Sequence, residues 1–225
     1  MNLSLPINEL AGYIGRQLDS LFPDGEGSRL TDMLPVVELA LDKVNWCFKH
    51  CTLPRYCRNG EACFDHLMAD HHCQFVLSLS QCVWKERADD RLASKLFGLN
   101  RAMHGLNCMY DTALPDIFLL FHATGTVLGK ASYDDYLVVL QNCTVGVHDG
   151  SYPVLGRGVA LAAGASVVGR CRIGDRVSVG SNAAIFKRDV PSDTVAYRNE
   201  GGALVLQPTQ TPFAQRFFNV PIESK

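Results

Sequence analysis

The sequence predicts an α+β fold in which a helical N-terminal part is followed by a parallel β-helix of six-residue repeats. Apolar residues recur at helical spacing through roughly the first hundred of the 225 residues. That spacing stops after Pro115, and from Leu155 onward the sequence repeats every six residues. We therefore expect a helical domain over residues 1–110, a β-helix over 111–205 and a C-terminal tail over 206–225.

The helical part contains four stretches whose apolar residues fall on one face of a helix. Such stripes are typical of amphipathic helices that pack together, so a small bundle or cap is expected. Between the second and third stretches, residues 51–70 contain Pro54 and the pair Asn59-Gly60, which predict a loop. The four stretches are residues 10–21, 33–48, 75–83 and 92–106.

The second part contains consecutive hexads that each open with an aliphatic residue. Each hexad would supply a short strand and a turn, with the aliphatic side chain inside a narrow prism. A β-sandwich would instead alternate with period two and have irregular turns, so the fixed period argues against it. We expect the opening residues to be buried, Leu161 and Ile173 among them. The hexads open at Leu155, Leu161, Val167, Ile173, Val179 and Ile185.

The repeat is interrupted twice upstream of these hexads. One residue is missing from the register at residues 134–136, and residues 146–153 are rich in turn-forming residues. The second interruption predicts a loop that projects from the β-helix, and such loops are where repeat scaffolds often carry function.

Composition excludes several classes of protein. The formal net charge is −2, whereas nucleic-acid and membrane-surface binders need a basic footprint. No stretch approaches the roughly 20 apolar residues that span a bilayer. The N-terminus has no basic flank followed by a long apolar run, so we expect no signal peptide and a cytoplasmic protein. The nine cysteines, an odd number, fit free thiols in a reducing compartment.

Cysteines and histidines cluster in the sequence between residues 47 and 73, which raises the alternative of a zinc site. The spacings include no CxxC pair, which most structural zinc sites use, and free cysteine also packs as a small hydrophobic residue. We therefore expect no metal. The cluster comprises Cys47, Cys51, Cys57, Cys63, Cys73, His66, His71 and His72.

Three segments resemble serine acetyltransferases of the hexapeptide-repeat superfamily: residues 122–125 (HATG), 141–146 (QNCTVG) and 153–191. The helical part is similar in architecture only. The resemblance implies a left-handed β-helix and a homotrimer, often paired into a dimer of trimers through the helical domains. It also implies acetyl-CoA bound between neighbouring β-helices, and acetyl transfer to the hydroxyl of a small-molecule acceptor.

The resemblance makes His122, the first residue of the HATG run, the general base. A hydroxyl is a poor nucleophile at neutral pH, and imidazole can remove its proton. A carboxylate is expected to orient the ring. Asp111 and Asp116 lie upstream, where the family carries its partner aspartate, and we favour Asp116 because a strand-like run leads from it directly to His122.

The sequence departs from the family at three positions near the acceptor. Phe121, Ser151 and Tyr152 stand where the family has aspartate, arginine and histidine, which help to hold the amino acid. Without them the charged ends of serine would be unpaired, which is costly when desolvated. The acceptor therefore stays open between serine and a sugar or glycan-precursor hydroxyl, and a catalytically inactive β-helical scaffold is a further alternative.

Further residues are candidates for holding the acceptor. His148, in the shortened loop, could replace the missing second histidine, and Asp111 and Tyr152 are also expected near the acceptor. Asp70 could reach an acceptor from the start of the third helix, or it could cap that helix.

The coenzyme is expected to contact mainly small residues and backbone amides. Ala163 and Gly164 occupy the turn that matches the pantetheine site of the family, and Ser181 stands in the next coil. Lys187 and Arg188 are available for the phosphates.

Overall fold

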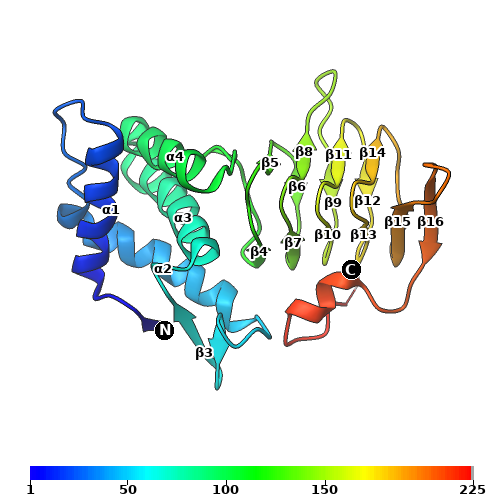
Figure 1. Cartoon of the computed structure of the whole chain (residues 1–225), viewed down its shortest axis with the longest axis horizontal. Helices are drawn as coiled ribbons and strands as arrows, with labels where there is room; N and C mark the ends of the chain where they lie inside the picture. Colours follow the sequence, from blue (N-terminus) through cyan, green and yellow to red (C-terminus); the bar gives the residue numbers. More distant parts are fainter. Residues whose placement is uncertain (224–225) are drawn as a thin grey trace.

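The computed structural model describes residues 1–223 and shows a helical part beside a parallel β-helix (Figure 1). All four predicted helices are present, and a short 3₁₀ turn, Leu30–Met33, precedes the second. Their apolar stripes face one another, so that Leu10, Ile14 and Leu18 of the first helix are at most 1% exposed. The helices are α1 (Ile7–Leu21), α2 (Leu34–Lys49), α3 (Ala69–Arg87) and α4 (Asp90–His104).

Part of the predicted loop over residues 51–70 is a β-hairpin, so the sequence prediction was wrong there. Strands β2 (Cys57–Arg58) and β3 (Glu61–Phe64) pair antiparallel, and β1 (Asn2–Leu3) pairs parallel with β3. The two turn residues, Asn59 and Gly60, have φ of 53° and 79°. An Asn-Gly pair with positive φ at both positions matches the twist of a two-residue hairpin, and this was the signal that the prediction missed.

The β-helix consists of about four turns that build three parallel sheets. Each complete coil contributes one short strand to each sheet, as the hexad pattern predicted. The first sheet contains β4 (Phe118–Leu120), β7 (Leu137–Val139), β10 (Ala160–Leu161), β13 (Ser178–Val179) and β15 (Thr194–Arg198). The second contains β5 (Val127–Leu128), β8 (Thr144–Gly146), β11 (Ser166–Val168) and β14 (Ala184–Phe186). The third contains β6 (Ser132–Tyr133), β9 (Val154–Leu155) and β12 (Arg172–Ile173).

The aliphatic residues that open the hexads point into the prism. All six, from Leu155 to Ile185, are at most 2% exposed, which confirms the prediction of an aliphatic core. A second core lies between the helices and the outer face of the first sheet, where Leu119 and Val138 pack with the helical part. The helical part therefore covers one side of the β-helix near its first coils.

The chain after the β-helix turns back toward the helices (Figure 1). Strand β16 (Leu204–Pro208) pairs antiparallel with β15, and the 3₁₀ turn Phe213–Phe217 follows it. The backbone N–H of Thr52 donates to the carbonyl of Phe217 at 2.9 Å, which ties this segment to the helical part. The last two residues of the predicted tail lie outside the described residues. None of the helices within residues 1–223 is long and apolar enough to cross a membrane.

Candidate active site

Successive coils turn at shared edges of the prism, and two of these edges carry the predicted site residues. The edge between the first and second sheets, here the His122 edge, contains residues 121–126, 140–143, 162–165 and 180–183. Backbone N–H groups of Asn142, Gly164 and Asn182 donate to carbonyls of the coil before, each at 2.9 Å. The edge between the second and third sheets, here the loop edge, contains residues 129–131, 147–153, 169–171 and 187–189.

His122 begins the turn that follows β4 and presents its imidazole to solvent. Its φ is 52° and its side chain is 75% exposed. Its backbone N–H donates to Oδ1 of Asp70 at 2.8 Å, and its Nδ1 lies 4.0 Å from Oδ2 of the same carboxylate. The backbone contact holds the turn and keeps the imidazole beside the carboxylate.

Asp70 is held in place by the helical part. It is the second residue of α3, where the partial positive charge of a helix N-terminus stabilises a carboxylate. Its side chain is only 11% exposed, and the Tyr56 hydroxyl donates to Oδ2 at 3.4 Å. Burial, followed by the charge of Asp70, raises the pKa of Tyr56, so the phenol stays protonated and remains a donor.

Asp116, the predicted partner of His122, lies at the opposite end of β4. The strand Phe118–Leu120 separates the two residues, and six extended residues span about 20 Å. The structure therefore does not bring Asp116 to His122, and Asp70 takes the place that the sequence analysis gave to Asp116. The reason is geometric, because an extended strand carries the residues at its two ends apart.

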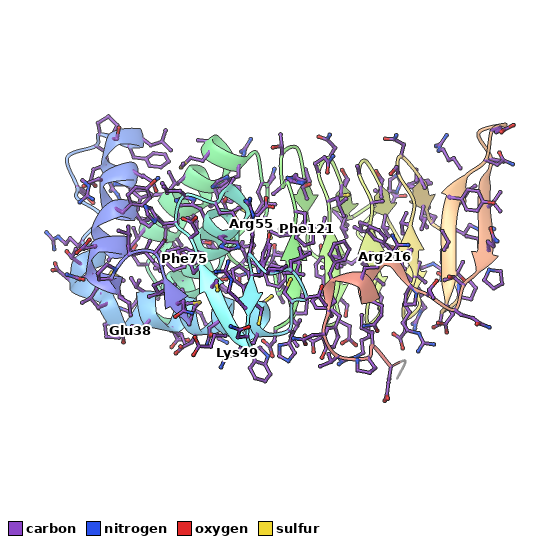
Figure 2. All side chains as sticks on the ribbon, turned by 60° about the horizontal axis from the view of Figure 1, so that its bottom comes forward. Glu38, Lys49, Arg55, Phe75, Phe121 and Arg216 are labelled. Atoms are coloured by element: carbon purple, nitrogen blue, oxygen red, sulfur yellow. The ribbon has the colours of Figure 1, made fainter. Side chains whose placement is uncertain are left out.

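Phe121 packs into the boundary between the helical part and the β-helix (Figure 2). It is 8% exposed, and its ring centroid lies 5.7 Å from that of Tyr56 and 5.0 Å from that of Phe217. The family aspartate at this position is thus replaced by a buried aromatic ring, which offers no charge to an acceptor.

The predicted coenzyme residues Ala163, Gly164 and Ser181 all lie on the His122 edge. Gly164 has φ of 73°, and a Cβ there would overlap the Asn182 carboxamide, so only glycine fits this turn. On the same edge, Oε1 of Gln141 is buried without a hydrogen-bond donor within residues 1–223. Small residues with one unused acceptor beside them suit a pantetheine arm, whose amide N–H groups are donors.

The two predicted phosphate ligands lie on the loop edge and differ in their surroundings. Lys187 Nζ lies 2.8 Å from Oδ2 of Asp149, and this ion pair lowers the pKa of the Asp149 carboxyl. Arg188 is exposed and forms no ion pair with any residue that the structure describes. Lys187 thus ties down the projecting loop, while the charge of Arg188 is available to a phosphate.

The three predicted acceptor-binding residues also gather at the loop edge. The predicted loop joins β8 to β9 (Figure 1). Within it, His148 Nδ1 lies 2.8 Å from Oδ2 of Asp149. Asp111 pairs with Lys130 at 2.9 Å, and Tyr152 is 51% exposed. The second sheet separates these residues from His122 within one chain, so the structure does not bring them to the imidazole.

The cysteines and histidines between residues 47 and 73 lie in different parts of the fold. Cys47 packs with the helices, whereas Cys73 packs with the first coils of the β-helix. His72 hydrogen-bonds with His104 at 2.8 Å and with Gln17 at 3.0 Å. No group of three or more His, Cys, Asp or Glu side chains within residues 1–223 is arranged to hold a metal ion, and all nine cysteines are free thiols.

Comparison with known proteins finds sequence relatives that are named serine acetyltransferase. No protein-family model matches the chain. Serine acetyltransferase from Synechococcus elongatus is 33% identical over 100 residues, which is 42% of this chain and 41% of that protein. Serine acetyltransferase from Mycobacterium tuberculosis is 29% identical over 129 residues, 55% and 56% of the two chains. The matched region thus spans about half the length of these curated relatives.

Solved structures extend the likeness to the helical part. The crystal structure of Neisseria gonorrhoeae serine acetyltransferase superposes with a TM-score of 0.68 at 21% identity, covering 94% of this chain and 83% of that one. A serine acetyltransferase in complex with CoA superposes with a TM-score of 0.61 at 18% identity, covering 78% and 75%. By sequence and by fold, the protein is a homologue of serine acetyltransferases, and its β-solenoid is consistent with the left-handed β-helix of the hexapeptide-repeat superfamily.

Proposed function

We propose that the protein is an acetyl-CoA-dependent O-acetyltransferase that moves an acetyl group to the hydroxyl of a small polar acceptor, with serine as the first candidate. The observation that supports this most is the pairing of an exposed imidazole, His122, with the buried carboxylate of Asp70. The pair lies on the same edge as the small residues Ala163 and Gly164. The curated relatives named serine acetyltransferase support the same reaction.

In this mechanism His122 moves one proton. Its Nε2 accepts the proton of the acceptor hydroxyl as that oxygen attacks the acyl carbon, and then returns it to the departing sulfur. Asp70 orients the ring through Nδ1 and stabilises the imidazolium, while Tyr56 and the backbone N–H of His122 hold the carboxylate. Acetyl-CoA supplies the acyl thioester, and the turn at Gly164 with the Gln141 acceptor would hold its pantetheine arm.

The acceptor site favours a second candidate alongside serine. Phe121 is buried among aromatic rings, so no carboxylate stands directly before His122 to meet an ammonium group. A sugar hydroxyl needs no such charge, because hydroxyls are satisfied by neutral hydrogen-bonding partners. We therefore propose a sugar or glycan precursor as the alternative acceptor.

We further propose that the protein works in the cytoplasm as a homotrimer or a dimer of trimers. The outer face of the second sheet supports an assembly, because it presents the Phe186 ring, which is 52% exposed, beside Val168. The free thiols support a reducing compartment. Multi-angle light scattering at micromolar concentration tests the assembly, and a monomer would contradict it.

Release of CoA thiol tests the activity. The chain is mixed with acetyl-CoA and either serine or one of a panel of sugars, and thiol formation is followed with and without the acceptor. Acceptor-dependent release that disappears in the His122→Asn variant is the expected result. If no acceptor raises the rate above that of the variant, the protein is a scaffold and the proposal fails. A preference for sugars over serine would select the alternative acceptor.

A further inference from the structure

A cavity of about 270 Å³ lies between α2, α3 and the segment that leads into β4. It is separate from the His122 edge, because its Asp116 and Phe118 stand at the other end of β4. From its lining we propose that this cavity binds a small aliphatic diamine. The residues that carry the proposal are Asp42, Lys43, Trp46, Gln74 and Asp116.

Gln74 gives the cavity an unused acceptor. The residue is only 1% exposed, and its Nε2 donates to the Phe118 carbonyl at 2.9 Å and to Cys47 Sγ at 3.1 Å. These two bonds fix the carboxamide, yet its Oε1 has no hydrogen-bond donor within residues 1–223. Buried carboxamide oxygens are nearly always paired, so the site lacks an N–H or O–H donor.

The rim of the cavity attracts positive charge. Asp42 and Asp116 place two carboxylates there against the single ammonium of Lys43, and none of the three forms an ion pair with any residue in the described chain. Trp46 lies beside them with 54% of its surface exposed. An indole face attracts a cation through its quadrupole, which adds to the preference of the two carboxylates.

These features together select among ligand classes. An anion would be repelled by the excess of carboxylate. A divalent metal held by two carboxylates keeps water ligands, and such a hydrated ion has no apolar surface to pack against Trp46. A diamine has N–H donors for the Gln74 oxygen and positive charge for the rim carboxylates, and its methylene chain can pack against Trp46.

Isothermal titration of the full chain with 1,4-diaminobutane tests the proposal without reference to acetyl transfer. We expect saturable binding of one molecule per chain, and no binding of the uncharged isostere 1,4-butanediol. The zwitterion 4-aminobutanoate should bind more weakly than the diamine, because its carboxylate faces the acidic rim. No saturable heat up to about 10 mM diamine, or tighter binding of 4-aminobutanoate, would overturn the proposal.

Charge-neutralising variants locate the site. Asp116→Asn and Asp42→Asn should each weaken diamine binding by about five-fold or more, since each removes one partly screened ion pair. Glu38→Gln is the matched control, because Glu38 is an exposed carboxylate one turn before Asp42 on α2 and outside this cavity. The Glu38→Gln variant should bind 1,4-diaminobutane with the same affinity as the wild-type protein. An equal loss in Glu38→Gln would show non-specific attraction and would exclude this cavity as the site.

Discussion

Oδ1 of Asp70 accepts a hydrogen bond from the backbone N–H of His122 at 2.8 Å, so the first turn of α3 is joined directly to the HATG turn of the β-helix. Gly105, just after α4, also packs closely against this turn. A Cβ added at Gly105 would lie only 3.0 Å from the backbone N of Gly125. The helical part therefore supplies the carboxylate of the proposed catalytic pair and also shapes the turn that carries the imidazole.

Replacing His122 with Asn should lower the turnover number by about 10²- to 10⁴-fold, because the general base is lost. Acetyl-CoA affinity should change little, since the imidazole acts on the proton of the acceptor. Steady-state thiol release and a separate CoA-binding titration measure the two effects. His148→Asn is the control for the loop edge. Full activity in the His122 variant together with loss in the His148 variant would place the base on the loop.

Asp70→Asn should lower turnover by about 10- to 100-fold, which is less than the loss of His122, because an orienting carboxylate is the weaker member of such a pair. The asparagine keeps an oxygen that can accept the backbone N–H of His122, so the variant removes mainly the charge. Asp116→Asn, at the far end of β4, should retain nearly full turnover. The opposite order of the two variants would restore Asp116 as the partner of His122.

Arg188→Ala should raise the KM for acetyl-CoA more than Lys187→Met does. Lys187 is already paired with Asp149, whereas Arg188 forms no ion pair within residues 1–223. We expect an increase of about five- to ten-fold for Arg188→Ala, the size of one charge-assisted phosphate contact, with an unchanged turnover number. A larger effect from Lys187→Met would mean that Lys187 leaves Asp149 to bind the phosphates.

The free energy of unfolding should fall as the pH drops from about 6.5 to about 4. Burial lowers the pKa of His71 and of His72 from 6.5 to about 4. As the pH falls, these histidines therefore take up protons in the unfolded chain before they do so in the folded protein. The stability that each neutral histidine contributes is complete above pH 6.5 and is lost toward pH 4. The loss is up to about 3 kcal/mol per histidine. Urea unfolding across this range measures it, and an equally steep profile in His72→Gln would contradict the assignment.

Periodicity in the sequence predicted the scaffold well, because each repeat of this fold is determined by its own few residues. A hexad needs an aliphatic residue inside the prism wherever it occurs, so Leu161 and Ile173 could be placed in the core from spacing alone. The helical stripes were predictable for the same reason. Asn59-Gly60 was equally local, but its hairpin was interpreted as a loop.

The site could be predicted only in part, because its partners are distant in the sequence. The HATG run pointed to His122, but 52 positions separate it from Asp70, and no periodicity connects a helix start to a β-helix turn. Asp116 was preferred because a strand-like run leads from it directly to His122, but that extended strand, Phe118–Leu120, keeps the two residues apart. The pairing of Lys187 with Asp149, across 38 positions, depends on how the coils stack and was likewise not visible.

The return of residues 213–222 to the helices has a consequence for how the protein matures during translation. The Thr52 hydroxyl donates to the carbonyl of Arg216, and the Asn219 carboxamide donates to the carbonyl of Lys49, across 164 and 170 positions. Helices synthesised early can fold on the ribosome, since domains fold as units during synthesis. These two bonds must wait until residues 216 and 219 have emerged, so the helical part gains them only after the whole β-helix has been synthesised.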